Sequence, residues 1–293
     1  MITIFGASGN TGGAAAAHLL KSGKKVRVVG RQAGKLAALV KAGAESCVGD
    51  IADGQFVRAA LAGAEAAYVL IPPNMATDDF RAYQRRAMDA LGGGIESTGV
   101  RHVVLLSSIG AHHEEGTGPI VALHEFENRL RKVGSLNALF LRAGFFMENV
   151  LMGMATIKAQ GIYGGPMPAD AAVQMIAAVD IGTYVGRRLE RLDFSGKSVV
   201  QLLGPKAVSQ SELVAILGRT IGKPVGYVQV SLEDIEKGML QGGLPPAVVS
   251  VFMEMYRGAG KGLVAPEEGL PVELAPTTFE TFAKNVFTQA YQG

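Results

Sequence analysis

The chain lacks several features that would place it in a particular class of protein. Cys47 is the only cysteine among its 293 residues, so no internal disulfide can form. No stretch stays apolar for the ~18 residues that a membrane span needs. No charged leader with a cleavage site precedes the first apolar run, which begins at the second residue. We therefore expect a cytoplasmic protein that does not bind membranes.

An excess of charge of one sign is also missing. The 28 Lys and Arg residues nearly balance the 26 Asp and Glu residues, which gives a formal net charge of +2. Basic residues occur at most as adjacent pairs such as Arg85 and Arg86. Such a distribution is not typical of proteins that bind nucleic acids. We expect a globular protein whose partner is a small molecule.

Short apolar runs alternate with helix-length segments through the first 150 residues. The runs have the length and the aliphatic, β-branched composition of buried parallel strands. They occupy residues 2–5, 26–30, 66–71, 102–108 and 137–142. Strand and helix in regular order predict a parallel sheet with helices on both faces. The predicted fold is therefore α/β, with a doubly wound sheet forming a Rossmann domain over residues 1–150.

The composition changes after Asn149, where Gly, Pro and Met become frequent. We expect residues 151–293 to form mainly a smaller, mixed lobe that binds the substrate. A late apolar run at residues 198–204 is predicted to rejoin the parallel sheet.

The segment GASGNTG at residues 6–12 joins the first predicted strand to a helix of small residues. Glycines at this spacing permit a tight turn and let the backbone approach a pyrophosphate, which the amides at the helix N-terminus then face. A glycine-rich turn that only connects strand to helix is the alternative. We favour a dinucleotide site, with contacts from Gly6, Ser8, Gly9, Asn10, Thr11 and Gly12.

No acidic residue occurs before Glu45, although a carboxylate after the second strand is what binds the ribose of NAD. The second predicted strand instead ends at Arg31, which could hold the 2′-phosphate of NADP. This pattern predicts a preference for NADP(H) over NAD(H), unless Arg31 is only a solvated surface cation. A third strand pattern at residues 46–49 comes between the runs at 26–30 and 66–71, and Asp50 directly after it could contact the adenine or could cap the next helix.

Several motifs together resemble the NmrA-like family of atypical short-chain dehydrogenase/reductases. They are GASGNTG, the strand-ending Arg31, VVLLSS at 103–108, His124, LRAGFFMENVL at 141–151 and PTTFETFAKNVF at 276–287. The sequence is most similar to the quinone-reductase and azoreductase-like members, which implies an NADPH-dependent oxidoreductase. It also resembles redox-sensing regulators of the same family that bind the dinucleotide without turning it over.

Ligands of doubly wound sheets bind beyond the carboxyl ends of the strands. We therefore expect further cofactor contacts from residues after the fourth, fifth and sixth strands, namely Ile71, Pro72, Ser107, Gly144 and Phe145. The residues Phe146, Met147, Asn149 and Met152 follow the sixth strand and are predicted to bind the substrate. Ordinary core packing between the two lobes is the alternative for the Phe and Met side chains.

The tyrosine and lysine pair of typical short-chain dehydrogenases is missing. No tyrosine is followed four residues later by lysine, and the nearest match is Tyr184 with Arg188. An arginine stays protonated and cannot join a proton relay. His124, near the position of the family tyrosine, could deliver a proton, and Ser107 could contact a substrate oxygen. The alternatives are a structural histidine on a helix and a serine that caps a loop.

Hydride transfer to a quinone or azo acceptor needs fewer catalytic groups from the protein than alcohol dehydrogenation does. The acceptor must stack close to the nicotinamide in an apolar pocket, and water can supply protons. We expect neither flavin nor metal, and interpret the run from His112 to Glu115 as a solvated loop.

The sequence thus leaves two hypotheses. The first is an NADPH-dependent reductase of a quinone-like or other small conjugated acceptor, and the second is a dinucleotide sensor that acts through a protein partner. The sequence does not predict an oligomeric state.

Overall fold

The central sheet has eight parallel strands in the order β13-β10-β6-β5-β4-β1-β2-β3. The computed structural model describes residues 1–293. The strands are β1 (Ile2–Ile4), β2 (Val26–Gly30), β3 (Glu45–Val48), β4 (Ala66–Val69), β5 (His102–Ser108), β6 (Asn137–Ala143), β10 (Lys197–Leu203) and β13 (Val272–Leu274). The sheet therefore takes strands from both sides of residue 150.

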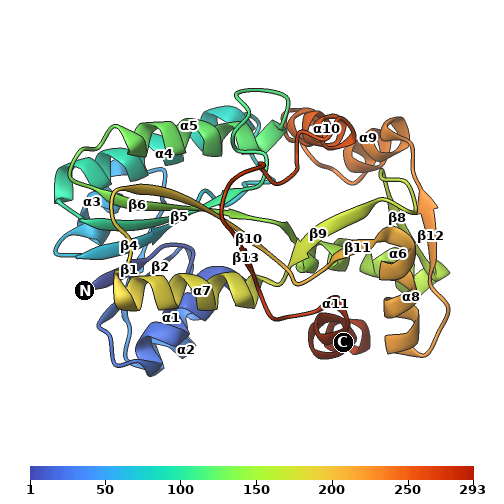
Figure 1. Cartoon of the computed structure of the whole chain (residues 1–293), viewed down its shortest axis with the longest axis horizontal. Helices are drawn as coiled ribbons and strands as arrows, with labels where there is room; N and C mark the ends of the chain where they lie inside the picture. Colours follow the sequence, from blue (N-terminus) through green and yellow to red (C-terminus); the bar gives the residue numbers. More distant parts are fainter.

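Helices cover both faces of this sheet (Figure 1). On one face lie α1 (Asn10–Lys21) and α7 (Ala178–Arg191), which contribute Ala15, Leu19 and Ile181 to an apolar core. The other face carries α3 (Gly54–Leu61), α4 (Phe80–Thr98) and α5 (Val121–Arg131). A 3-10 turn at Ala33–Leu36 and α2 (Ala37–Lys41) follow β2. This arrangement confirms the predicted doubly wound α/β fold.

The helices α1 and α7 pack almost backbone to backbone. A Cβ atom added to Gly182 would lie 2.3 Å from the carbonyl oxygen of Thr11, and one added to Gly186 would lie 2.8 Å from the His18 ring. Small residues on both helices make this approach possible. His18 and Glu190 join the same pair of helices through a contact of 2.9 Å between Nε2 and Oε2.

A smaller lobe with two short sheets stands beside the carboxyl ends of the main sheet (Figure 1). One sheet contains β7 (Phe145–Phe146), β9 (Ala172–Ile176) and β11 (Ala207–Ser209), and the other contains β8 (Ile162–Gly165) and β12 (Gly226–Gln229). Its helical segments are a 3-10 helix (Met147–Gly153), α6 (Met154–Gln160), α8 (Gln210–Ile221), α11 (Phe279–Phe282), a π-helical turn (Ala283–Phe287) and α12 (Thr288–Gln292). Three buried phenylalanines, Phe279, Phe282 and Phe287, anchor the core of this lobe. The predicted smaller mixed lobe is present.

A helical hairpin, α9 (Leu232–Gln241) and α10 (Pro246–Gly260), connects this lobe to α4. The Phe80 and Phe252 rings meet edge to face with centroids 5.8 Å apart. Glu254 of α10 bonds Arg81 of α4 at 2.5 Å and accepts from the amide of Gly116, 3.1 Å away. From α10 the chain runs back across the molecule to β13 (Figure 1).

None of the helices combines the length and apolar character required to cross a bilayer.

Candidate active site

The glycine turn after β1 lies at the N-terminus of α1. Gly6 has a φ of +65°, a conformation that favours glycine. A Cβ on Gly12 would lie 2.5 Å from the carbonyl oxygen of Gly6, so no larger residue fits there. The N-cap residue Gly9 has no side chain to bind the first amides, and the first turn contains no acidic residue. The N-terminus of α1 is thus available to an anion such as a pyrophosphate.

The three polar residues of this turn differ in their surroundings. Ser8 and Asn10 are exposed, whereas Thr11 is buried. The Thr11 hydroxyl accepts a hydrogen bond of 3.0 Å from the fully buried Tyr68. Burial raises the pKa of Tyr68, so this phenol stays a hydrogen-bond donor. The hydrogen bond from Tyr68 of β4 therefore holds the Thr11 side chain in place, while Ser8 and Asn10 face solvent.

Arg31 follows β2, is exposed and forms no ion pair with any carboxylate. Asp50 accepts a bond of 2.9 Å from the amide of Ala52, whereas the residue that caps α3 is Asp53. Burial raises the pKa of the Tyr83 phenol on α4, the charge of Asp50 raises it further, and the charges of Arg31 and Arg86 lower it. The charges of Asp50, Arg31 and Arg86 therefore all act on the Tyr83 phenol.

Sequence reasoning missed Tyr83 and Arg86 as companions of Arg31. They lie on α4, about fifty residues further along the chain, and carry no motif of their own. The fold brings them together because α4 packs beside α3, whose N-terminus follows Asp50.

The other predicted cofactor residues lie where β4, β5 and β6 end. Ile71 and Pro72 are half-buried in the segment after β4. A Cβ on Gly144 would lie 2.7 Å from the carbonyl oxygen of Gln174, so the chain passes close to β9 there. Phe145, the next residue, is 38% exposed. Its ring is thus available to a ligand at the carboxyl edge.

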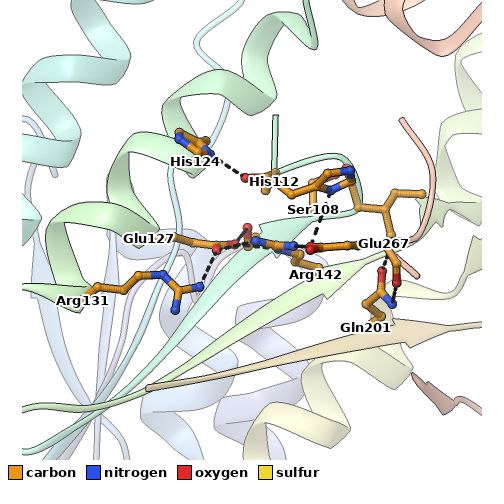
Figure 2. A network of polar contacts seen from close by, with 11 residues as sticks. Ser108, His112, His124, Glu127, Arg131, Arg142, Gln201 and Glu267 are labelled. Carbon is orange, nitrogen blue, oxygen red and sulfur yellow. Dashed lines mark hydrogen bonds and ion pairs between the residues drawn. The ribbon is translucent and has the colours of Figure 1, made fainter. Parts of the chain in front are cut away.

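The strand register places three polar residues in one row on the α5 face of the sheet. Arg142 of β6 pairs with Ser107 of β5 on one side and with Gln201 of β10 on the other. Above this row lies Glu127 of α5, which is buried and accepts bonds from Arg142 at 3.0 and 2.8 Å (Figure 2). Arg142 also bonds Glu267 of the segment before β13. Burial acts to lower the pKa of Arg142, but bonds to the two carboxylates outweigh it and raise that pKa.

Ser107 is part of this polar network. Its hydroxyl donates to Glu127 over 2.6 Å, and only 3% of the residue is exposed. With its proton used in this way, Ser107 can offer a ligand only its oxygen lone pairs. The neighbouring Ser108 donates to the carbonyl of Ile109 at 2.9 Å.

His124 lies near the start of α5 (Figure 2), and both of its ring nitrogens are engaged. Its Nδ1 is 2.9 Å from the carbonyl oxygen of Ala111, so this nitrogen is the donor. Its Nε2 is 2.8 Å from the side-chain amide of Asn128, from which the neutral ring accepts. Protonated His124 would need the Asn128 amide to turn and present its oxygen. Asn128 is thus the direct partner of the imidazole.

The four predicted substrate residues follow β6 in different environments. Met147 is 1% exposed and belongs to the core of the smaller lobe. Phe146 is half-buried against the main core, and Asn149 is half-buried as well. Met152 is 78% exposed. Of the two interpretations of the Phe and Met side chains, core packing describes Met147, whereas Met152 remains available to a ligand.

Tyr184 and Arg188 lie on α7, on the face of the sheet opposite to α5. The Tyr184 hydroxyl donates to Glu273 of β13 over 2.7 Å. Burial first, and this carboxylate second, raise the pKa of Tyr184.

The rings of His112 and His113, in the loop before α5, have centroids 3.9 Å apart and planes inclined at 42°. No three His, Cys, Asp or Glu side chains gather as a potential metal site.

The sequence model of the NmrA-like family matches residues 1–283, which confirms the resemblance inferred from the motifs. An NAD(P)H azoreductase of Xenophilus azovorans is 28% identical over 256 residues, covering 87% of this chain and 86% of that protein. Quinone oxidoreductase 2 of Escherichia coli is 26% identical over 267 residues, covering 89% of both chains. The crystal structure of an NADPH-dependent quinone oxidoreductase from Escherichia coli, complexed with NADPH, matches with a TM-score of 0.79 and 23% identity, over 98% of this chain and 100% of that one.

Proposed function

The chain belongs to the NmrA-like family, and from this premise we propose that it is an NADPH-dependent reductase of a quinone-like or other small conjugated acceptor. The observation that carries the proposal is the glycine turn at the N-terminus of α1, where no side chain caps the first amides. The cation Arg31 follows the neighbouring strand β2. The similar azoreductase and quinone oxidoreductase support this reaction class.

The turn fits a dinucleotide because Gly12 lets the start of α1 pack against the backbone of Gly6, which keeps the turn tight and the first amides of α1 free for a pyrophosphate. The amides of α1 would hold the pyrophosphate, with Ser8 and Asn10 at its edge. Arg31 would pair with the 2′-phosphate, assisted by Arg86, and Asp50 would face the adenine. Ile71, Pro72, Gly144 and Phe145 would line the path of the cofactor along the carboxyl edge.

When bound, NADPH supplies a hydride, and two-electron reduction of the acceptor consumes one proton in addition. In our proposal Phe145, Phe146 and Met152 keep the acceptor stacked and exclude water, with Asn149 as a polar contact. Ser107 accepts a hydrogen bond from the ligand. His124, or water in its place, supplies the proton once the Asn128 amide has turned. No flavin or metal enters this scheme.

The direct experiment is oxidation of NADPH by the purified protein with a panel of quinones and azo dyes. NADH serves as the matched cofactor, and no flavin is added. Turnover with a preference for NADPH supports the reductase. NADPH binding without oxidation by any acceptor contradicts it.

Arg31→Ala tests the basis of the cofactor preference. Loss of a charge-assisted phosphate contact costs ~1.5–3 kcal/mol, which raises the KM for NADPH roughly tenfold to a hundredfold. The KM for NADH should hardly change. Arg101→Ala, at the opposite end of the strands, is the matched control. Equal effects of Arg31→Ala on both cofactors would show that Arg31 does not select NADPH.

One observation keeps the sensor as a second candidate. Ser107 and His124 both use their protons within the protein. A sensor needs no proton donor, and it would bind NADP and NADPH with different affinities while remaining inactive with every acceptor.

A further inference from the structure

A polar hollow lies on the α5 face of the sheet, on the side of α5 away from α4. It has a volume of about 410 Å³, and only two of its ten lining residues are hydrophobic. The lining comes from α5, β6, β10 and two loop segments, and its polar members include Glu127, Asn128, Arg131, Arg142, Lys197 and Glu267. Such a lining suits a charged ligand better than an aromatic one.

The charges around the hollow do not cancel. Three cations, Arg131, Arg142 and Lys197, face two carboxylates, Glu127 and Glu267. Arg142 is committed to both carboxylates through all three of its side-chain nitrogens (Figure 2). One positive charge therefore remains in excess.

Lys197 is a cation without a counter-ion. Its ammonium group donates to the carbonyl oxygens of Val133, at 2.8 Å, and Leu136. No carboxylate lies within ion-pair distance of it. Burial lowers the pKa of Lys197, because part of its hydration is lost without an opposite charge in return. One N–H of the ammonium group remains for a ligand.

Arg131 also has unused donors. Its guanidinium makes one long bond of 3.4 Å to Glu127 and stacks over the Phe140 ring, 4.7 Å from the ring centroid. Its Nε and Nη1 have no partner in the protein, and their N–H groups point to different edges of the guanidinium, where each can donate to a ligand. The contact with the Phe140 ring restrains the guanidinium, and its free N–H groups can donate charge-assisted hydrogen bonds to an oxyanion.

We propose that this hollow binds an oxyanion between Arg131 and Lys197. The phosphate, carboxylate or sulfonate group can belong to a free anion or to one end of the acceptor, since His124 lines the same hollow. Asn128 adds a polar contact at the end near His124. The site lies on the α5 face of the sheet and is separate from the glycine turn at the N-terminus of α1.

Titration of the protein with inorganic phosphate, followed by calorimetry, tests the proposal. The protein is first saturated with NADP⁺, so that the glycine turn and Arg31 are occupied. We expect one saturable phosphate per chain, with affinity falling at least tenfold in Arg131→Gln and in Lys197→Gln. Lys132→Gln is the matched control, because this residue ends the same helix outside the hollow, and it should change the affinity less than twofold.

Two results would overturn the proposal: no saturable binding to the wild-type protein, or equal weakening by all three substitutions. Lys197 also bonds the carbonyl oxygens of Val133 and Leu136 after α5, so Lys197→Gln can destabilise the fold. Arg131→Gln tests the site without removing these bonds. Circular dichroism checks both variants.

Steady-state kinetics then distinguish the two sources of the oxyanion. Competition between phosphate and an acceptor carrying a sulfonate, but not its uncharged analogue, assigns the hollow to the acceptor. Phosphate binding without such competition assigns it to a free anion. The calorimetric result stands even if no acceptor is reduced, so the site and the proposed reductase activity can fail separately.

Discussion

Arg142 and Glu127 form a buried ion pair with two hydrogen bonds, in which Nε and Nη2 of the arginine lie 3.0 and 2.8 Å from the two carboxylate oxygens. The pair joins α5 to β6. Through Ser107 and Glu267 it also joins β5 and the segment before β13. One pair of side chains thus connects four parts of the chain.

Arg142→Met should destabilise the protein strongly, since it leaves the Glu127 carboxylate buried with only the neutral Ser107 hydroxyl and the long contact to Arg131. Removing one partner of a buried pair costs ~3–5 kcal/mol. Unfolding in urea measures the loss. Addition of Glu127→Met should recover part of it, whereas the exposed control Arg191→Met should change stability by less than ~0.5 kcal/mol. A cost as small as that of the control would mean that the pair does not stabilise the fold.

Gly12→Ala should abolish dinucleotide binding. The added Cβ would lie 2.5 Å from the Gly6 carbonyl oxygen, so the turn must open and its amides lose their direction. We expect at least a hundredfold weaker binding of NADPH, measured by nucleotide fluorescence. Gly34→Ala is the control, because a Cβ there meets nothing within 4 Å. Unchanged affinity in Gly12→Ala would exclude the turn as the pyrophosphate site.

His124→Gln tests the proposed proton donor. If the imidazole supplies the proton, kcat with a quinone should fall ~10²-fold or more, while the dissociation constant for NADPH stays the same. His113→Gln, in the loop before α5, serves as the control. An unchanged kcat would assign the proton to water and leave His124 as a brace between Ala111 and Asn128.

Glu148 gives a dependence of stability on pH. Burial raises the pKa of its carboxyl group, although the amide of Ala178 donates to both oxygens, at 2.9 and 3.1 Å. The folded protein therefore holds this proton to a higher pH than the unfolded chain does. Stability from the protonated group is complete below the unfolded pKa, and it is lost as the pH rises through the folded pKa.

The comparison is with Glu148→Gln, which cannot ionise. The free energy of unfolding of the wild type, minus that of the variant, should fall as the pH is raised from ~4 through the titration of the folded carboxyl group. Urea denaturation over this range measures the difference. A difference that rises with pH would mean that the bonds from Ala178 outweigh burial.

The tight turn at Gly6 and the place of Arg31 directly after β2 could be predicted because they depend on local sequence alone, whereas their roles in binding stay predictions. The spacing of Gly6, Gly9 and Gly12 needs only the strand before it and the helix after it. The cap of α11 is equally local, since the Thr278 side chain accepts from the amide of Thr281, three residues on. Such features are settled within a few residues of the chain.

The polar row could not be predicted in this way. Ser107, Arg142 and Gln201 become neighbours only through the register of three strands, and Glu267 arrives from a segment 125 residues beyond Arg142. Alternation along one strand shows which face a residue occupies but not what lies opposite it. Local sequence could not separate Asp50 from Asp53 as the cap of α3 either, because both carboxylates precede the helix.

The late arrival of α7, β10 and β13 in the sequence sets the order in which the protein can fold during translation. When residue 150 leaves the ribosome, the small side chains of α1 have no partner helix, and β6 is an open sheet edge. The nucleotide-binding half therefore completes its core only after Arg191, and its edge only after Leu274. Until then the nascent chain carries an unpaired strand and exposed apolar surface, the features that chaperones bind. A chain truncated before β13 should mature poorly even though every residue of the glycine turn is present.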